Sequence, residues 1–182
     1  MVASTAVAAP RQMITSANVA ALDPNQLKLM IATFNQLIVS QDWAGSLELE
    51  SEMSAIAKTF ESSDPGRAGR INYNLGRVHT SLGREGGIEE ATLCYKKTIE
   101  MTKKTGDNDI LSQGVFRLAE CYVKMRRVDE AMDLCDDIGK ESMEPKAILQ
   151  FAAILQLNRE PSRALEILEE YLYNIESSWD NQ

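Results

Sequence analysis

Residues 71–100 constrain the fold of this chain more than any other stretch, because they contain two helical patterns placed back to back. Apolar side chains recur at intervals of three and four residues in each pattern, so each helix has one apolar face. Gly76 and Ala91 are small residues at positions where the two helix backbones must approach closely. A single hairpin of this kind cannot bury both of its apolar faces, so it requires neighbouring helices.

The pattern of this hairpin occurs four times along the chain. In the three clearest copies, the first helix has a small residue after an apolar one, and the second helix has an alanine followed four positions later by Tyr, Cys or Leu. A weaker first copy combines residues 29–39 with Trp43-x-x-Ser46. The small residues of the four second helices (Ser46, Ala91, Ala131 and Ala164) are 45, 40 and 33 positions apart. The clearest copies read Leu75-Gly76-x-x-His79 with Ala91-x-x-x-Tyr95, Leu118-Ala119-x-x-Tyr122 with Ala131-x-x-x-Cys135, and Phe151-Ala152-x-x-Leu155 with Ala164-x-x-x-Leu168.

This combination of Leu-Gly-x-x-aromatic and Ala-x-x-x-aromatic, at a period near 34 residues, is typical of tetratricopeptide repeats. From about residue 23 to residue 177 the sequence therefore resembles a tetratricopeptide-repeat (TPR) protein. The second copy has Asn-Leu-Gly in its first helix and Lys-Thr-Gly-Asp at the end of its second, which is similar to the extended repeats of LGN/Pins and kinesin light chain. The resemblance implies an all-α fold, a right-handed superhelical solenoid of about four helical hairpins.

The resemblance implies a TPR-like helical-repeat domain, residues 23–178, between two short tails. Residues 1–22 are expected to form a flexible N-terminal tail, and residues 179–182 a C-terminal tail. The N-terminal segment is rich in Ala, Ser and Thr, as organelle transit peptides are, but its single arginine makes it weakly basic for one. A targeting role for this tail stays open.

Local signals predict where the helices begin and end. We expect Asp23 to cap the first helix with Gln26 reaching back to it, and a second helix to run continuously from residue 42 to residue 61. Gly106 is expected to end a helix, and Asp107 or Asp109 to cap the next. Further breaks are expected at residues 62–66, 84–87, 126–127 and 158–161, with Ser142 opening the fourth copy.

Bulk properties exclude several classes of function. The 182 residues, 44% hydrophobic, suffice for one ordinary core. A net charge of -8 argues against nucleic acid or anionic membrane as the main partner, and no run of 18 apolar residues suggests membrane insertion. Three cysteines (Cys94, Cys121 and Cys135) fall inside expected helices with no Cys-x-x-Cys pair. They predict reduced packing thiols in a reducing compartment, the cytoplasm.

No group of residues in the sequence has the spacing of a catalytic site. The one histidine, His79, occupies a packing position of the repeat and has no cysteine or acid at metal-ligand spacing. The glycines at 83, 86 and 87 lack the Lys-Ser/Thr of a phosphate-binding loop. We therefore expect a protein that is not an enzyme and that uses no cofactor or metal.

The resemblance implies a partner-binding groove, because the first helices of tetratricopeptide repeats line a concave surface. Counted from the small residue of each first helix, the groove contains six bases and one acid, in a chain of net charge -8. Such a reversal of sign favours an extended or helical, acidic partner segment, with Asn side chains bonding its backbone. Mixed charge on an ordinary solvated helix face is the alternative explanation. The groove residues are Lys28, Asn35, Arg70, Tyr73, Asn74, Arg77, Gln113, Phe116, Arg117, Glu120, Lys124, Lys146 and Gln150.

The carboxylate clamp of chaperone-binding members of this family is only partly present. Asn35, Asn74 and Arg117 match the clamp in residue type. Ile31 and Gln113 stand where the two clamp lysines belong. We therefore expect recognition of an internal acidic segment and not of a free C-terminus.

Two non-catalytic functions fit these features. The first is an adaptor or scaffold that holds a segment of a partner protein in the groove. The alternative is a small structural subunit of a large assembly, which docks through its convex face and its terminal helices, where Trp43 and Trp179 lie. The sequence specifies neither the partner nor the oligomeric state.

Overall fold

A computed structural model describes residue 19, residues 22–138 and residues 145–179, with side chains given up to residue 134 and from residue 148 to residue 173. The predicted tails, 1–22 and 179–182, lie almost entirely outside these ranges. Within the described ranges every regular element is an α-helix and no β-strand occurs, which confirms the expected all-α class. The helices are α2 (Pro24–Val39), α3 (Trp43–Glu48), α4 (Glu50–Phe60), α5 (Pro65–Leu82), α6 (Gly87–Thr105), α7 (Asn108–Lys124), α8 (Val128–Ile138), α9 (Pro145–Leu157) and α10 (Pro161–Trp179).

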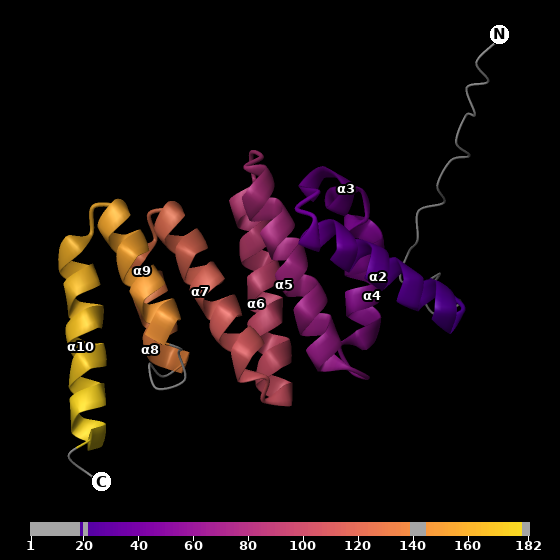
Figure 1. Ribbon diagram of the computed structural model, residues 1–182. Helices are drawn as coiled ribbons and strands as arrows, with labels where there is room; N and C mark the ends of the chain where they lie inside the picture. Colours follow the sequence, from indigo (N-terminus) through magenta and orange to yellow (C-terminus); the bar gives the residue numbers. More distant parts are fainter. Residues whose placement is uncertain (1–18, 20–21, 139–144, 180–182) are drawn as a thin grey trace.

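The helices pack in the order in which they occur along the chain (Figure 1). Each of α4, α5 and α6 packs on the helix that follows it, α7 packs on both α8 and α9, and α9 packs on α10. Contacts between α5 and α7 and between α7 and α9 also bring alternate helices together. The result is a row with α2, α3 and α4 at one end and α10 at the other.

Three of the expected helix caps are present. The backbone N–H of Asn25 donates to Asp23 Oδ1, and that of Asp23 donates to Gln26 Oε1, both at 3.3 Å, which is the predicted capping box of α2. Gly106 ends α6 with a φ of 70°. Asp107, and not Asp109, then caps α7 by accepting from the N–H of Ile110 at 3.3 Å.

The connections between helices also follow the sequence signals. Gly83 and Gly86, with φ of 58° and 75°, form the turn between α5 and α6, where a left-handed backbone favours glycine. Turns at residues 125–127 and 158–160 separate α7 from α8 and α9 from α10. Ser142 lies outside the described residues, and α9 begins at Pro145.

The helix expected from residue 42 to residue 61 is interrupted, which corrects one prediction. Leu49, with φ −98° and ψ 4°, separates α3 from α4. Its N–H bonds to the carbonyl of Ser46, three residues back, so the last turn of α3 is tightened. Ser46 Oγ also donates to the carbonyl of Asp42 at 2.7 Å, a bond of the type that bends helices. The apolar periodicity continues through the break and therefore gave no sign of it.

Buried apolar side chains form two clusters among the described residues. The first joins α2, α4 and α5 around Phe34, Met53 and Ile56, which are fully buried. The second extends from α6 to α10 and includes Tyr95 and Phe151. The core thus runs along the whole row.

Small residues let α5, α6 and α7 pack closely. A Cβ on Gly76 of α5 would lie 2.6 Å from the ring of Tyr95 on α6, closer than side chains pack. Thr98, also on α6, is enclosed by glycines on both sides. Its hydroxyl donates to the carbonyl of Gly69 at 3.3 Å, and a Cβ on Gly114 would lie 3.1 Å from its methyl group. α6 is therefore fitted between its two neighbours at glycine positions.

Replacing Gly76 by alanine is expected to destabilise the protein. The added methyl group has no space beside the buried ring of Tyr95, and overpacking of this kind costs about 1–3 kcal/mol. That penalty exceeds the gain of about 1 kcal/mol in helix propensity. Urea denaturation followed by circular dichroism measures the change in the free energy of unfolding.

Gly66→Ala on the same helix is the matched control, because a Cβ at Gly66 meets no atom closer than 3.7 Å. Gly66 lies in the first turn of α5, so this variant gains at most the same helix propensity, and it has no collision. Equal stability of the two variants would contradict the close contact of α5 and α6.

Candidate functional site

Predicted groove residues from two helices meet on one surface. On α5, Arg77 follows Tyr73 by four residues and Asn74 by three, so it shares a helix face with each of them. The side chain of Tyr73 contacts the guanidinium of Arg117 on α7, which joins the two helix faces. We call this surface the α5–α7 face and define it as Tyr73, Asn74, Arg77, Arg117, Glu120 and Lys124.

Glu120 organises the α7 side of this face. Its mostly buried carboxylate accepts from Arg117 Nη1 at 2.9 Å and lies 2.8 Å from Lys124 Nζ. Burial of the carboxyl raises the pKa of Glu120, but the hydrogen bonds from Lys124 and Arg117 outweigh burial and lower it. Burial of the Arg117 guanidinium lowers its pKa. The hydrogen bond to Glu120 and the contact with Tyr73 outweigh burial and raise it. Both cations are thus held in place, with one carboxylate between them.

Arg77 is the cation of the α5–α7 face without an acidic partner. Its guanidinium carbon lies 5.5 Å from the centre of the Trp43 ring, a cation–π arrangement that orients the side chain. No carboxylate of the described residues lies within ion-pair distance of it. Trp43 was not among the predicted groove residues, because it lies on α3, the second helix of its hairpin.

A contact between two asparagines links α2 to this surface. Asn74 Nδ2 donates to Asn35 Oδ1 at 3.5 Å, across 39 positions of sequence. The contact is long for a hydrogen bond, so the two amides are exchangeable for other partners. The sequence placed both residues on the same surface, and the structure brings them together.

Arg70 differs from Arg77, because its charge is already neutralised. Its Nη2 lies 2.9 Å from Asp107 Oδ2, and this hydrogen bond lowers the pKa of Asp107. Both residues line a pocket of about 500 Å³. Asp107 was predicted as a helix cap alone and was not counted in the groove. The predicted excess of six bases over one acid is therefore smaller in the structure. The pocket is lined by Asp64, Gly66, Arg67, Arg70, Thr105 and Asp107.

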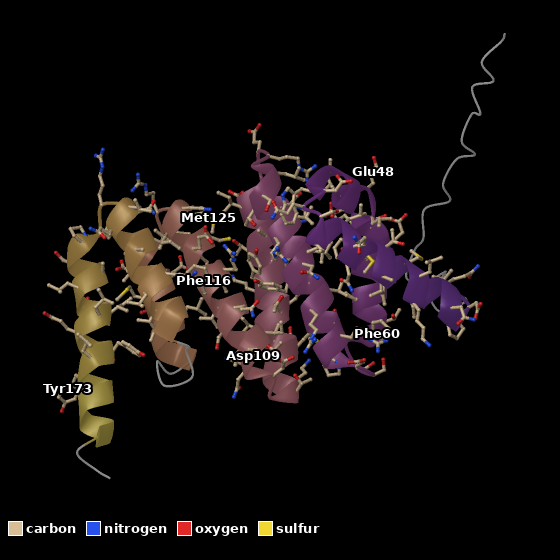
Figure 2. All side chains as sticks on the ribbon, in the orientation of Figure 1. Glu48, Phe60, Asp109, Phe116, Met125 and Tyr173 are labelled. Atoms are coloured by element: carbon tan, nitrogen blue, oxygen red, sulfur yellow. The ribbon has the colours of Figure 1, made fainter. Side chains whose placement is uncertain are left out.

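The remaining predicted residues are not part of the connected surface. Phe116, which was expected to point into the groove, is buried in the core on α7 (Figure 2), with the Arg117 guanidinium 5.4 Å from the centre of its ring. Lys28, Gln113 and Gln150 are exposed, on α2, α7 and α9. Lys146 lies on α9, and its side chain is outside the described residues.

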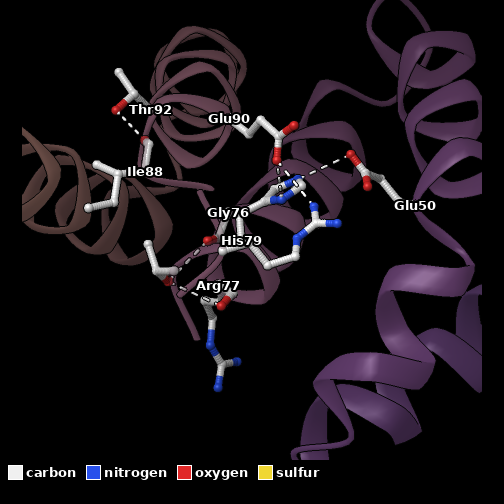
Figure 3. Close-up of polar contacts among 9 residues, drawn as sticks. Glu50, Gly76, Arg77, His79, Ile88, Glu90 and Thr92 are labelled. Carbon is white, nitrogen blue, oxygen red and sulfur yellow. Dashed lines mark hydrogen bonds and ion pairs between the residues drawn. The ribbon is translucent and has the colours of Figure 1, made fainter. Parts of the chain in front are cut away.

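His79 is buried where three helices meet (Figure 3). Its Nε2 lies 3.2 Å from Glu50 Oε1 of α4, and its Nδ1 lies 3.0 Å from Glu90 Oε2 of α6. The approach of Glu90 is an ion-pair distance without hydrogen-bond geometry. His79 is almost inaccessible to solvent, so these contacts tie α5 to its neighbours and leave the ring no access to a substrate.

The described thiols are unreactive. Burial of Cys94, with a further contribution from Glu50, raises its pKa to about 12, and burial of Cys121 raises its pKa to about 11. Both are free cysteines and remain protonated near neutral pH. The side chain of Cys135 lies outside the described residues.

The described part of the chain contains neither a metal-binding cluster nor a membrane-spanning helix. Within residues 22–134 and 148–173, no group of three or more His, Cys, Asp or Glu side chains is arranged to hold a metal ion. None of the helices in the described part of the chain has the length and apolar composition needed to cross a membrane.

Comparison with known proteins assigns this chain to no family. No protein-family model matches it, and no curated protein matches it significantly. The resemblance to tetratricopeptide repeats therefore depends on the residues of this chain alone and stays a prediction.

Glu120→Gln is expected to lower the free energy of unfolding at about pH 7 by about 1 kcal/mol, because two cations lose their shared carboxylate. The folded-state pKa of Glu120 is lowered, so its contribution is present above the unfolded pKa and is lost as the pH falls through the folded one. The difference from wild type should therefore shrink in acid. Urea denaturation at a series of pH values measures it.

Glu100→Gln is the control, since Glu100 pairs with Lys104 on an exposed helix surface at 3.0 Å. Exposed pairs contribute little, so this variant should stay close to wild type at every pH. An equal effect of the two substitutions would show that Glu120 is no more important than a surface acid.

Proposed function

We propose that this chain is a non-enzymatic adaptor of the tetratricopeptide type, whose α5–α7 face binds an extended, acidic segment of another protein. The repeated motif of an apolar residue followed by Gly or Ala, with an alanine in the second helix, supports a right-handed solenoid of about four hairpins. Sequential packing of the helices, with further contacts between α5, α7 and α9, is compatible with that arrangement. In such a solenoid α5 and α7 are the first helices of neighbouring repeats.

The observation that carries the proposal is the state of Arg77. Its guanidinium is oriented by Trp43, and no carboxylate within the described residues neutralises it. A partner carboxylate can therefore bind it without displacing an internal acid, and guanidinium binds carboxylate through two parallel hydrogen bonds. Because the side chain is already oriented, less conformational entropy is lost on binding.

The surroundings of Arg77 favour an acidic peptide over a neutral one. Arg117 and Lys124 share the single carboxylate of Glu120, so the α5–α7 face has three cations and one acid. This local excess contrasts with the net charge of -8 of the whole chain. The face therefore attracts negative charge, while the rest of the molecule repels it.

Asn74 and Asn35 supply the uncharged part of the recognition. Their long mutual contact leaves amide donors and acceptors that can bond the backbone of an extended segment. Arg77 lies one helical turn beyond Asn74 on the same face, which places backbone and side-chain contacts side by side. Extended backbone with acidic side chains is thus the chemistry that this surface matches.

Arg77→Gln is expected to weaken binding of a fluorescein-labelled peptide of alternating glutamate and serine about tenfold, the loss of one charge-assisted contact. Fluorescence anisotropy measures the affinity. A lysine–serine peptide of the same length should not bind, and added salt should weaken the glutamate peptide. Arg77 is preferable to Arg117 as a test, because reversing the charge of Arg117 would place two carboxylates together at Glu120.

Arg67→Gln on the same helix is the matched control. Arg67 also lies over an aromatic ring, that of Phe60 at 4.8 Å, but it pairs with Asp64 at the opposite end of α5. The Arg67→Gln variant should therefore bind the glutamate peptide like wild type. Equal weakening by both variants would indicate only a general charge effect, and unchanged binding by Arg77→Gln would contradict the proposal.

A further inference from the structure

Large apolar side chains are exposed at both ends of the row of helices. On α2, Leu29 is 68% exposed and Val39 is 77% exposed. On α10, Leu165 and Leu172 are each 56% exposed, and Tyr173, at 70%, projects from the outer side of the helix (Figure 2). The two helices lie at opposite ends of the row (Figure 1), so one chain presents two separate apolar faces.

The joint between α6 and α7 shows how such a face is normally covered. Ile99 of α6 packs against α7, where a Cβ on Gly114 would lie 3.4 Å from Ile99 Cγ1. About two turns further along α7, Cys121 contacts Thr92 of α6. Both Ile99 and Thr92 are buried by these contacts.

The exposed face of α10 corresponds to the α6 side of this joint. Ile99 stands eight positions and Thr92 one position after Ala91, the small residue of α6. The residues at eight positions and one position after Ala164, the small residue of α10, are Leu172 and Leu165. They are exposed because no helix of the described chain follows α10. α10 therefore has the surface of an internal joint without its covering helix.

The exposed face of α2 has the spacing of the other half of the joint. Ala32 and Val39 of α2 are seven positions apart, as Gly114 and Cys121 are on α7, so each pair lies on one side of its helix. Ala32 and Val39 are both exposed, and Ala32 is small like Gly114. α2 thus presents a face of the kind that covers α6, and α10 has no such helix against it.

We propose that two copies of this chain associate head to tail, with α10 of one copy packed on α2 of the next. Leu172 would lie opposite Ala32 and Leu165 opposite Val39, as Ile99 and Thr92 lie opposite Gly114 and Cys121. The contact is heterologous, so each copy keeps one free end and the association continues beyond a dimer.

Charge favours this pairing over a symmetric one. α2 has one lysine and no acid along its length. The described side chains of α10 include three glutamates and one arginine, and that arginine, Arg163, is 2.8 Å from Asp129 of α8. Two α10 helices would therefore repel each other, whereas α10 against α2 brings opposite charge together.

Sedimentation velocity of the full chain tests the association. The weight-average mass of the wild type should rise with concentration beyond that of a dimer. Leu29→Glu with Val39→Glu closes the α2 face, and Leu165→Glu with Leu172→Glu closes the α10 face. Each double variant should remain a monomer with unchanged helical circular dichroism. Leu93→Glu, at an equally exposed leucine of α6, is the control and should associate like wild type.

Mixing the two double variants separates the possible contacts. One variant keeps an intact α10 face and the other an intact α2 face, so the mixture should form a dimer and nothing larger. A dimer formed by the α2-closed variant alone would replace the proposal with a symmetric α10 contact. A wild type that stays monomeric at every concentration, or a mixture that stays monomeric, would overturn it.

Discussion

The close fit of α6 between α5 and α7 is the constraint on which the rest of the structure depends. The ring of Tyr95 occupies the space that a side chain at Gly76 would need, and Thr98 is enclosed by Gly69 and Gly114. Glycine is unfavourable inside a helix by about 1 kcal/mol relative to alanine. Here that loss is offset by burial, since Tyr95 and Thr98 are fully enclosed. Distances between helices are therefore set by a few small side chains.

This fit also positions the candidate binding surface. Tyr73 lies 5.9 Å from Tyr95 between ring centres, so its body belongs to the packed interior. The same side chain contacts Arg117 on α7, which is fixed in turn by Glu120. A displacement of α6 would thus move the cations of the α5–α7 face. The core therefore holds the polar side chains of this surface in place before a partner binds.

Several features coded by neighbouring residues could be predicted from the sequence, whereas the ion pairs between distant residues could not. The capping box at Asp23 and the helix end at Gly106 depend on a few adjacent positions and are present as expected. The neutralisation of Arg70 joins residues 37 positions apart, and nothing local distinguishes Asp107 as its partner. Phe116 and Arg117 are adjacent, so a rotation of one position decides which of them reaches solvent.

An array of repeats that buries each helix against the next helix leaves the outer faces of its first and last helices uncovered. In this chain those faces keep the spacing of an internal joint, with Leu165 and Leu172 at one end and Ala32 and Val39 at the other. If copies associate through them, the stacking of helices continues from one copy to the next. The α5–α7 faces of successive copies would then follow the twist of the solenoid. An acidic segment longer than one copy could bind several of these faces, and each added contact would raise its effective concentration at the next.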